Sequence, residues 1–371
     1  MKGSAIPTLG PGAPEGSHPR SRPRPAGCSL TGFVDREETR VRASLRRRSQ
    51  SAALMALLAL PLGCGEEQVA PPPPAPGWIR HASNPILAPG PPGSWDAGGV
   101  SSPCVLRLDA LTWAMWYAGR DSVRSQIGLA TSLDGVRWTK HPDNPIFGPA
   151  AAPAWDSFEV GEPCVLLDDG VFRMYYSGRN GTSKSIGVAT SVDGHEWTRS
   201  DANPILTASP PGTWDDLQVG APWVLREGVG FRMWYGGRGS GVTDIAIGHA
   251  TSTDGLFWTK NLAPILDPEA LEAVTTAACV VRSGTSYRLW YTAYHETAGG
   301  GASPGVIDLA QSPDGIECTF TETALAPGPP GAWDARTLRS ACVLAQGSSA
   351  RMWYAAEAED GTGAIGFALT P

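Results

Sequence analysis

A unit of about sixty residues occurs five times along the chain, and this repetition constrains the fold more than any single motif. The clearest mark of each unit is an aromatic pair at the end of a short apolar run. The pairs are Trp116-Tyr117, Tyr175-Tyr176, Trp234-Tyr235, Trp290-Tyr291 and Trp353-Tyr354, spaced 59, 59, 56 and 63 residues apart. A unit of several short strands cannot bury its faces alone, so it must stack on its neighbours, as in a propeller or solenoid.

Each complete unit contains four predicted strands. In the second unit, Asp, Gly and Asn separate four short runs, at 164–167, 172–177, 186–191 and 197–205. Such residues form tight turns between antiparallel strands. Four short antiparallel strands per unit predict a β-propeller blade, and no stretch keeps helical periodicity beyond two or three turns.

The ends of the repeat region predict how the ring closes. The fifth unit stops after its third strand, yet residues 78–87, before the first unit, match residues 138–147, the fourth strand of blade one. An N-terminal strand that completes the last blade removes the open edge. We therefore expect an all-β, five-bladed β-propeller over residues 78–371, with four antiparallel strands per blade and strand 78–87 completing blade five.

The N-terminal region has the features of an export signal. Three arginines, 46–48, precede an apolar run, 52–62, that is too short to span a bilayer permanently. The Leu-Gly-Cys ending at Cys64 resembles the lipobox of bacterial lipoproteins, and plain secretion is the alternative. We assign 1–63 to the signal with an over-long N-terminal extension, and 64–77 to a proline-rich tether. The expected location is periplasmic or cell-surface, with lipid on Cys64 as the only membrane contact.

The region after the signal is acidic. From Cys64 onward, 19 Lys and Arg stand against 32 Asp and Glu, which gives a net charge of −13. An acidic body without a basic stripe argues against nucleic acid as a partner. No feature of the sequence predicts a cofactor, and we expect a monomer.

The cysteines indicate packing. The same place on the first strand of four blades is taken by Cys104, Cys164, Cys279 and Cys342, and Trp223 takes it in blade three. A residue repeated around a ring is a packing choice, and equivalent positions on neighbouring strands seldom meet disulfide geometry. We expect buried free thiols. No Cys/His cluster has zinc spacing, so no metal site is predicted.

Two recurrent motifs are interpreted as scaffold. The S-x-D-G-x-x-W motif predicts a hairpin in which Ser and Asp bond the turn backbone and Gly takes a positive φ. It occurs at 132–138, 191–197 and 252–258. Trp-Asp pairs, at 95–96, 155–156, 214–215 and 333–334, precede four first strands and favour aromatic packing with an Asx turn.

A binding site is expected where the blades differ, at the mouth where first strands begin and second strands end. The chain places carboxylates, arginines, a histidine and an amide there. The candidates are Glu159, Glu162, Arg120, Arg179, Arg238, Gln218, His295 and Arg339. Unlike polar groups around one mouth predict a binding funnel, and a solvated rim of Arg–Glu pairs is the alternative.

The whole pattern resembles a known family. Five blades, the motifs P-x-V-L, M-W-Y-x-G-R and I-G-x-A-T-S, and the displaced first strand resemble the five-bladed glycoside hydrolases. These are the arabinanases and xylosidases of glycoside hydrolase family 43, with the related invertases and levansucrases. The resemblance implies a catalytic carboxylate before the first strand of three successive blades. The matching positions here are Ser102, Glu162 and Ala221.

Only Glu162 keeps a carboxylate, whereas glycoside cleavage needs two carboxyl groups across the bond. Glu159 is the expected second acid, and Glu296 and Glu357 are alternatives. The resemblance implies an exported, glycosidase-like protein acting on a plant or microbial polysaccharide or oligosaccharide, with the candidate Arg, His and Gln side chains holding sugar. A non-catalytic sugar- or protein-binding propeller is the rival interpretation. A sialidase-like hydrolase, with the arginines binding a carboxylate, is the third.

Overall fold

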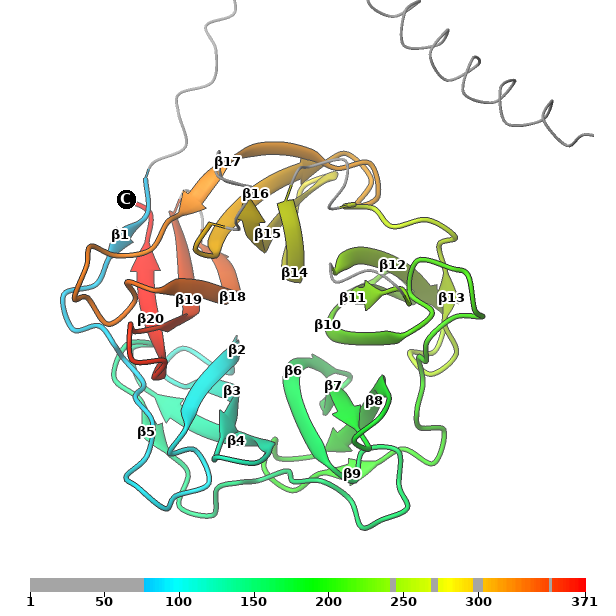
Figure 1. Cartoon of the computed structure of the whole chain (residues 1–371), viewed down its shortest axis with the longest axis horizontal. Helices are drawn as coiled ribbons and strands as arrows, with labels where there is room; N and C mark the ends of the chain where they lie inside the picture. Colours follow the sequence, from blue (N-terminus) through cyan, green and yellow to red (C-terminus); the bar gives the residue numbers. More distant parts are fainter. Residues whose placement is uncertain (1–76, 241–244, 268–272, 296–302, 347–348) are drawn as a thin grey trace, which may run out of the picture. The chain divides into compact units, whose positions relative to one another are not determined.

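The computed structural model describes residues 77–240, 245–267, 273–295, 303–346 and 349–371. These residues form an all-β ring of five blades (Figure 1). The proposed signal, Cys64 and nearly all of the tether lie outside the described part. In the described part no helix is long and apolar enough to cross a membrane.

The first three blades follow one another along the chain, and within each the strands pair antiparallel in chain order. Blade one is also joined to blade five by one parallel pair, Gly99 with Gly363. Blade one consists of β2 (Gly99–Arg107), β3 (Trp113–Arg120), β4 (Ser125–Ser132) and β5 (Thr139–Lys140). Blade two consists of β6 (Glu159–Asp168), β7 (Val171–Arg179), β8 (Lys184–Ser191) and β9 (Thr198–Arg199). Blade three consists of β10 (Gln218–Glu227), β11 (Gly230–Arg238), β12 (Ala246–Ser252) and β13 (Thr259–Lys260).

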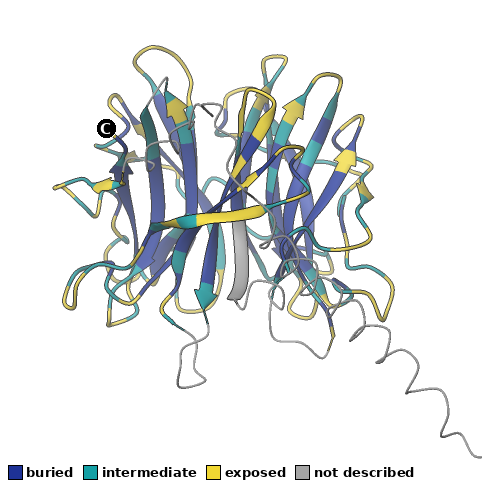
Figure 2. Cartoon of the chain, turned by 90° about the horizontal axis from the view of Figure 1, so that it is seen from above, coloured by how far each residue is buried: buried dark blue, intermediate teal, exposed yellow. Residues whose placement is uncertain are grey.

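The last two blades use the same order, but blade five takes one strand from the N-terminal side. Blade four consists of β14 (Ala273–Ser283), β15 (Ser286–His295), β16 (Val306–Ser312) and β17 (Thr319–Leu325). Blade five consists of β18 (Thr337–Gln346), β19 (Ser349–Glu357), β20 (Gly363–Leu369) and β1 (Ile79–Arg80). The second and third strands of the blades are largely buried, whereas the outer strands and the loops carry many of the exposed residues (Figure 2).

The N-terminal strand occupies the outer edge of blade five, as the sequence match predicts. Strand β1 pairs antiparallel with β20, with Ile79 opposite Leu369 and Arg80 opposite Ala368. Further along, Leu87 forms a β-bridge with Ile365, as Phe147 does with Ile127 in blade one. Residues 78–87 thus provide the fourth strand of blade five.

A side chain on each first strand contacts the next blade. The sulfur atoms of Cys104, Cys164, Cys279 and Cys342 accept hydrogen bonds from the N–H groups of Val165, Val224, Val343 and Val105, at 3.1, 3.2, 3.1 and 3.3 Å. In blade three, Trp223 Nε1 donates to the carbonyl of Val280 at 2.9 Å. These contacts, called the axial column below, occur at all five junctions between neighbouring blades. The four thiols are buried and free, which confirms their predicted packing role.

In blades one, two, three and five the Trp-Asp pair supplies an ion pair to the outer strand of the same blade, called the clasp below. The buried Asp carboxylate meets a basic side chain of the outer strand in the pairs Asp96–Lys140, Asp156–Arg199, Asp215–Lys260 and Asp334–Arg80, at 2.5, 2.8, 2.7 and 2.8 Å. In three of these blades a second-strand tyrosine hydroxyl also donates to the carboxylate. The structural interpretation of this motif is therefore confirmed.

The S-x-D-G hairpins are structural as well. Ser132 Oγ accepts hydrogen bonds from the N–H groups of Asp134 and Gly135, and Gly135 has φ 77°. The Gly135 carbonyl accepts a hydrogen bond from Trp353 Nε1 of blade five at 2.7 Å. The same contact between neighbouring blades joins Trp116 to Gly194 and Trp234 to Gly315.

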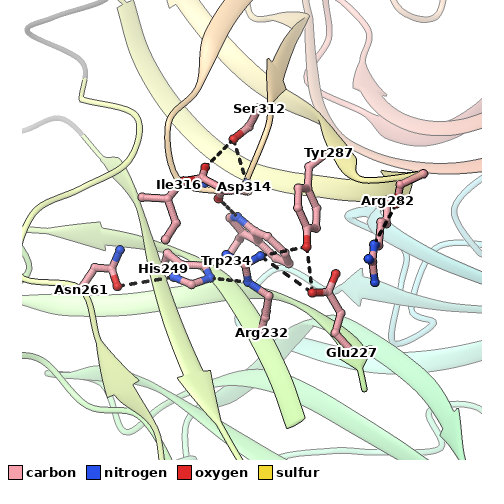
Figure 3. A network of polar contacts seen from close by, with 12 residues as sticks. Glu227, Arg232, Trp234, His249, Asn261, Arg282, Tyr287, Ser312, Asp314 and Ile316 are labelled. Carbon is pink, nitrogen blue, oxygen red and sulfur yellow. Dashed lines mark hydrogen bonds and ion pairs between the residues drawn. The ribbon is translucent and has the colours of Figure 1, made fainter. Parts of the chain in front are cut away.

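A partly buried polar network joins blade three to blade four away from the mouth (Figure 3). Arg232 Nε donates to His249 Nε2 at 3.0 Å, and Arg232 Nη1 donates to the Tyr287 hydroxyl at 2.9 Å. The Tyr287 hydroxyl donates in turn to Glu227 at 2.8 Å. Burial, together with the neighbouring Arg232 charge, lowers the pKa of His249 to about 4.

The His249 shift predicts loss of stability in weak acid. In the unfolded chain the imidazole takes up a proton near its ordinary pKa of 6.5, whereas in the fold it does so only near 4. The free energy of unfolding should therefore fall as the pH drops from about 6.5 to about 4, by up to about 3 kcal/mol. Chemical denaturation across this range measures it. Leucine occupies this place in blades one and four, so His249→Leu is a suitable variant. It should remove the fall in the free energy of unfolding between pH 6.5 and 4 that is due to His249. An unchanged pH dependence would contradict the assignment to His249.

A second prediction concerns the edge of blade five. Removing residues 78–87 exposes the β20 edge, empties the Leu87 position and leaves the buried Asp334 without Arg80. We expect the free energy of unfolding to fall by at least about 3 kcal/mol, measured by thermal and urea unfolding. The matched control is a chain that starts at residue 77 and keeps residues 78–87. Equal stability of the two truncations would show that the strand is dispensable.

Candidate functional site

The first strands of blades one to three carry the same unusual backbone conformation at the mouth. Ser102, Glu162 and Ala221 have φ values of 50°, 52° and 49°, although none is glycine. Each precedes a proline, and each lies in a β-bulge just before the axial column. The left-handed region costs a non-glycine residue about 1–2 kcal/mol. Such strain gathers at functional sites, which makes these three positions candidates on structural grounds.

These positions line the central cavities of the ring. The larger cavity has a volume of about 270 Å³, and its polar side chains are Ser101, Ser102, Glu162, Lys184, Gln218, Tyr294, Arg339 and Ser340. A smaller one of about 120 Å³ is lined by Ser102, Glu159, Glu162, Arg179 and others. Ser102 and Glu162 line both, so Glu162 lies where the two cavities meet.

Glu162 is held by three donors. Its Oε2 atom lies 2.7 Å from Lys184 Nζ, and it accepts hydrogen bonds from Ser177 Oγ at 2.5 Å and from the N–H of Ala221 at 2.9 Å. Burial raises the pKa of Glu162, but the Lys184 charge and the hydrogen bonds outweigh it, so the pKa lies below its ordinary value. Glu162 is therefore ionised at neutral pH, which suits a base or a hydroxyl-orienting group better than an acid.

The second predicted acid lies in the smaller cavity. Glu159 Oε1 is 2.9 Å from Arg179 Nε, and the Arg179 guanidinium lies 5.0 Å from the centre of the Phe158 ring. Its side chain is 27% exposed, so a ligand can reach it, but only in competition with Arg179. Both predicted carboxylates thus line one cavity, and each already has a cationic partner.

Gln218 and Arg339 line the larger cavity, as predicted. Arg339 Nη2 lies 2.7 Å from Glu357, which is one of the Arg–Glu rim pairs that the sequence left open. Arg120 and Arg238 line neither cavity: Arg120 is exposed, and Arg238 Nε is buried without a hydrogen-bond partner among the described residues. Glu296 lies outside the described residues.

His295 has a partner that the repeat does not provide elsewhere. Its Nε2 atom lies 2.9 Å from Asp308 Oδ2, and Asp308 is fully buried. Asp308 stands opposite Tyr291, where blade one has Gly128 opposite Tyr117. In blade one the Trp95 ring covers that glycine.

Asp308 also accepts a hydrogen bond from Thr323 of the outer strand at 2.8 Å. Burial raises the pKa of Asp308, and the Thr323 and His295 contacts only partly offset that effect. Asp308 therefore contacts both the outer strand, through Thr323, and His295. In the other four blades the buried Asp is paired with a Lys or Arg of the outer strand.

Sequence reasoning missed Lys184 and Ser177, the two side chains that hold Glu162. Their signal was a departure from the repeat: the residue opposite the last residue of the second strand is Ser125 in blade one and Lys184 in blade two. Ser177 likewise stands where blade one has Ala118 and blade three has Gly236.

Comparison with known proteins supports a glycoside hydrolase-like fold. Residues 106–209 match the family model described as beta-1,4-mannooligosaccharide phosphorylase, glycoside hydrolase family 130. Two uncharacterised proteins of Mycobacterium tuberculosis strains are each 28% identical to the chain, over 76% of this chain and 96% of their own length.

Solved structures show the same fold. One is described under the words "The GH130 family of mannoside phosphorylases contains glycoside hydrolases that target beta-1,2 mannosidic linkages in Candida mannan". It has a TM-score of 0.62 at 16% identity, and the match covers 81% of this chain and 95% of that one. An N-acetylgalactosamine deacetylase of F. plautii, in complex with blood group B trisaccharide, has a TM-score of 0.59 at 18% identity, covering 80% and 94%.

The chain thus has a glycoside hydrolase-like five-bladed propeller fold. Within that class, the part matched by a family model resembles family 130. The finer resemblance to family 43 and the invertases stays a prediction, as do the roles of the site residues.

The Lys184–Glu162 pair gives a direct prediction. Lys184→Met removes the main cation beside Glu162 while keeping a long apolar stem, so the pKa of Glu162 should rise. Carboxyl-detected NMR titration of the wild type and the variant measures it. Arg179→Met, which removes the partner of Glu159, is the matched control and should shift Glu162 less. An unchanged Glu162 titration in Lys184→Met would contradict the assignment.

Proposed function

We propose that this protein is a carbohydrate-active propeller that binds a sugar unit in the central cavity and acts on it with Glu162. The observation that carries this proposal is the Glu162 carboxylate itself: ionised, in a strained conformation, and placed where the two cavities meet. Strain and a perturbed pKa at the same residue in a cleft mark a functional site.

The cavity suits a small polar ligand. Its volume of about 270 Å³ is close to the lower end of ligand pockets, and its lining offers hydroxyls, an amide, a carboxylate and two cations. Sugars present many hydroxyls that both donate and accept hydrogen bonds. The Glu162 carboxylate is a strong acceptor for such a hydroxyl, and Gln218, Ser102 and Ser340 are suitable donors and acceptors.

Glycoside cleavage is the reaction that the site supports best. Glu162 and Glu159 both line the smaller cavity, and two carboxyl groups are what that reaction requires. A mannoside substrate is suggested by the family model and by the mannoside-active relative with the same fold. Their descriptions name both phosphorylases and hydrolases, so the acceptor of the glycosyl group is either phosphate or water.

A second candidate function is sugar binding without turnover. Both carboxylates are already paired with cations, and the matching positions in blades one and three are Ser102 and Ala221. The sialidase-like alternative has less support. It needs Arg120, Arg179 and Arg238 to act together, and of these only Arg179 lines one of the two cavities.

The test is Glu162→Gln, which keeps the shape of the side chain and removes its charge. Wild type and variant are assayed for binding and turnover with manno-oligosaccharides, arabinan, xylan and fructan fragments, with and without inorganic phosphate. We expect turnover to fall at least about 100-fold with little change in melting temperature. Glu317→Gln, on the exposed hairpin of blade four, is the control and should keep full activity.

The outcomes separate the candidates. Turnover that requires phosphate supports a phosphorylase, and turnover without it supports a hydrolase. Wild-type binding without turnover, lost in Glu162→Gln, supports the sugar-binding function. Binding to none of these glycans, or full activity of Glu162→Gln, would contradict the proposed site.

A further inference from the structure

We propose that His141, Asp143 and His195 form a site for a divalent transition metal ion of the Zn²⁺ type at the outer junction of blades one and two. The first two residues follow β5, the outer strand of blade one, and His195 lies in the hairpin between β8 and β9 of blade two. None of the three lines the central cavities, so this site is separate from the mouth.

The three side chains converge. Asp143 Oδ2 lies 3.9 Å from His141 Nδ1 and 3.7 Å from His195 Nε2, and the three ligand atoms all lie within 4.8 Å of one another. The two imidazole rings lie 4.2 Å apart, with 34° between their planes. Ligands of a tetrahedral zinc ion are about 3.4 Å from each other, given bond lengths of about 2.1 Å. Small side-chain rotations therefore bring these three atoms to ligand distance.

The donor set selects the class of ion. Two imidazole nitrogens and one carboxylate oxygen are ligands that zinc and its neighbours in the first transition row prefer. Calcium and magnesium prefer oxygen ligands only. The side chains of His141 and His195 are 27% and 29% exposed, and Asp143 is 70% exposed, which leaves room for water as a fourth ligand.

The hydrogen bond of His141 also fits a metal ligand. The N–H of Asp143 donates a hydrogen bond to His141 Nδ1 at 3.3 Å. In this contact Nδ1 is the acceptor, so its lone pair points out of the ring as that of a metal ligand does. A bound ion would replace this long hydrogen bond, and the Asp143 carboxylate would offset part of the ion's charge.

Comparison with blade five shows which of the three residues the turn alone explains. In blade five, His81 occupies the place of His141, and its Nδ1 accepts the same hydrogen bond, from Ser83 at 3.1 Å. The turn explains a histidine at that position without any metal. It does not explain Asp143, which is Ser83 in blade five, or His195, whose counterpart in the hairpin facing blade five is Val136. The three ligands meet at one junction because both additional residues occur there.

A bound ion would tie two blades together at the periphery, where they are otherwise joined through hairpin contacts. Because the ion binds the folded arrangement and not the unfolded chain, it should stabilise the protein by linkage. The site therefore predicts both a binding stoichiometry and a thermal shift.

The experiment uses the full chain purified without a polyhistidine tag and freed of metal with EDTA. Zn²⁺ is titrated by calorimetry, and melting temperature is followed with and without Zn²⁺. We expect one Zn²⁺ equivalent in wild type, with binding weakened more than about tenfold in His195→Ala and the Zn²⁺-dependent rise in melting temperature lost. His81→Ala, the same histidine position without the other two ligands, should behave as wild type.

Melting in EDTA shows whether His195→Ala is folded, and Asp143→Asn gives a second variant that keeps the shape of its side chain. Equal Zn²⁺ affinity of wild type and both variants would overturn the proposal, as would absence of Zn²⁺ binding by wild type. Equal response to Ca²⁺ or Mg²⁺ would overturn the assignment of the ion class.

Discussion

The contacts of the axial column hold the ring together where its first strands meet. A sulfur atom or an indole N–H on each first strand bonds the backbone of the next, so the five blades are joined to one another at their inner edges. A buried backbone group must find a partner, and here the partner is a small or aromatic side chain of the preceding blade. The mouth depends on this arrangement, because Glu162 lies only two residues before Cys164 and its conformation is set by the same bulge.

The buried carboxylate of blade four has a different partner from those of the other blades. In the other four blades a buried Asp is paired with a Lys or Arg of the outer strand, which offsets the cost of desolvating both charges. Blade four places its buried Asp308 on the third strand and pairs it with His295 at the mouth. The one blade without the usual clasp is thus the one that places an Asp-backed imidazole at the rim.

Most of the scaffold was predictable from the sequence because every scaffold element is repeated. The match of residues 78–87 to 138–147 predicted the outer strand of blade five, and the recurrence of Trp-Asp and S-x-D-G predicted their structural roles. The site was predictable only in part, because it consists of departures from the repeat. Glu162 was found through its proline neighbour, whereas Lys184 comes from another strand. The meeting of His141 with His195 depends on how two blades pack, which no spacing along the chain records.

The shared backbone of Ser102, Glu162 and Ala221 has a consequence for how such a protein can change. All three positions keep the left-handed conformation, although Ala221 has no polar group to present there. The conformational cost of aiming a side chain from these positions is therefore already met, whether or not a functional group is attached. A new acid at Ser102 or Ala221 requires a change of side chain and not of main chain. In evolutionary terms, this main chain allows functional groups to be gained or lost at the mouth by substitution alone, without remodelling of the first strands.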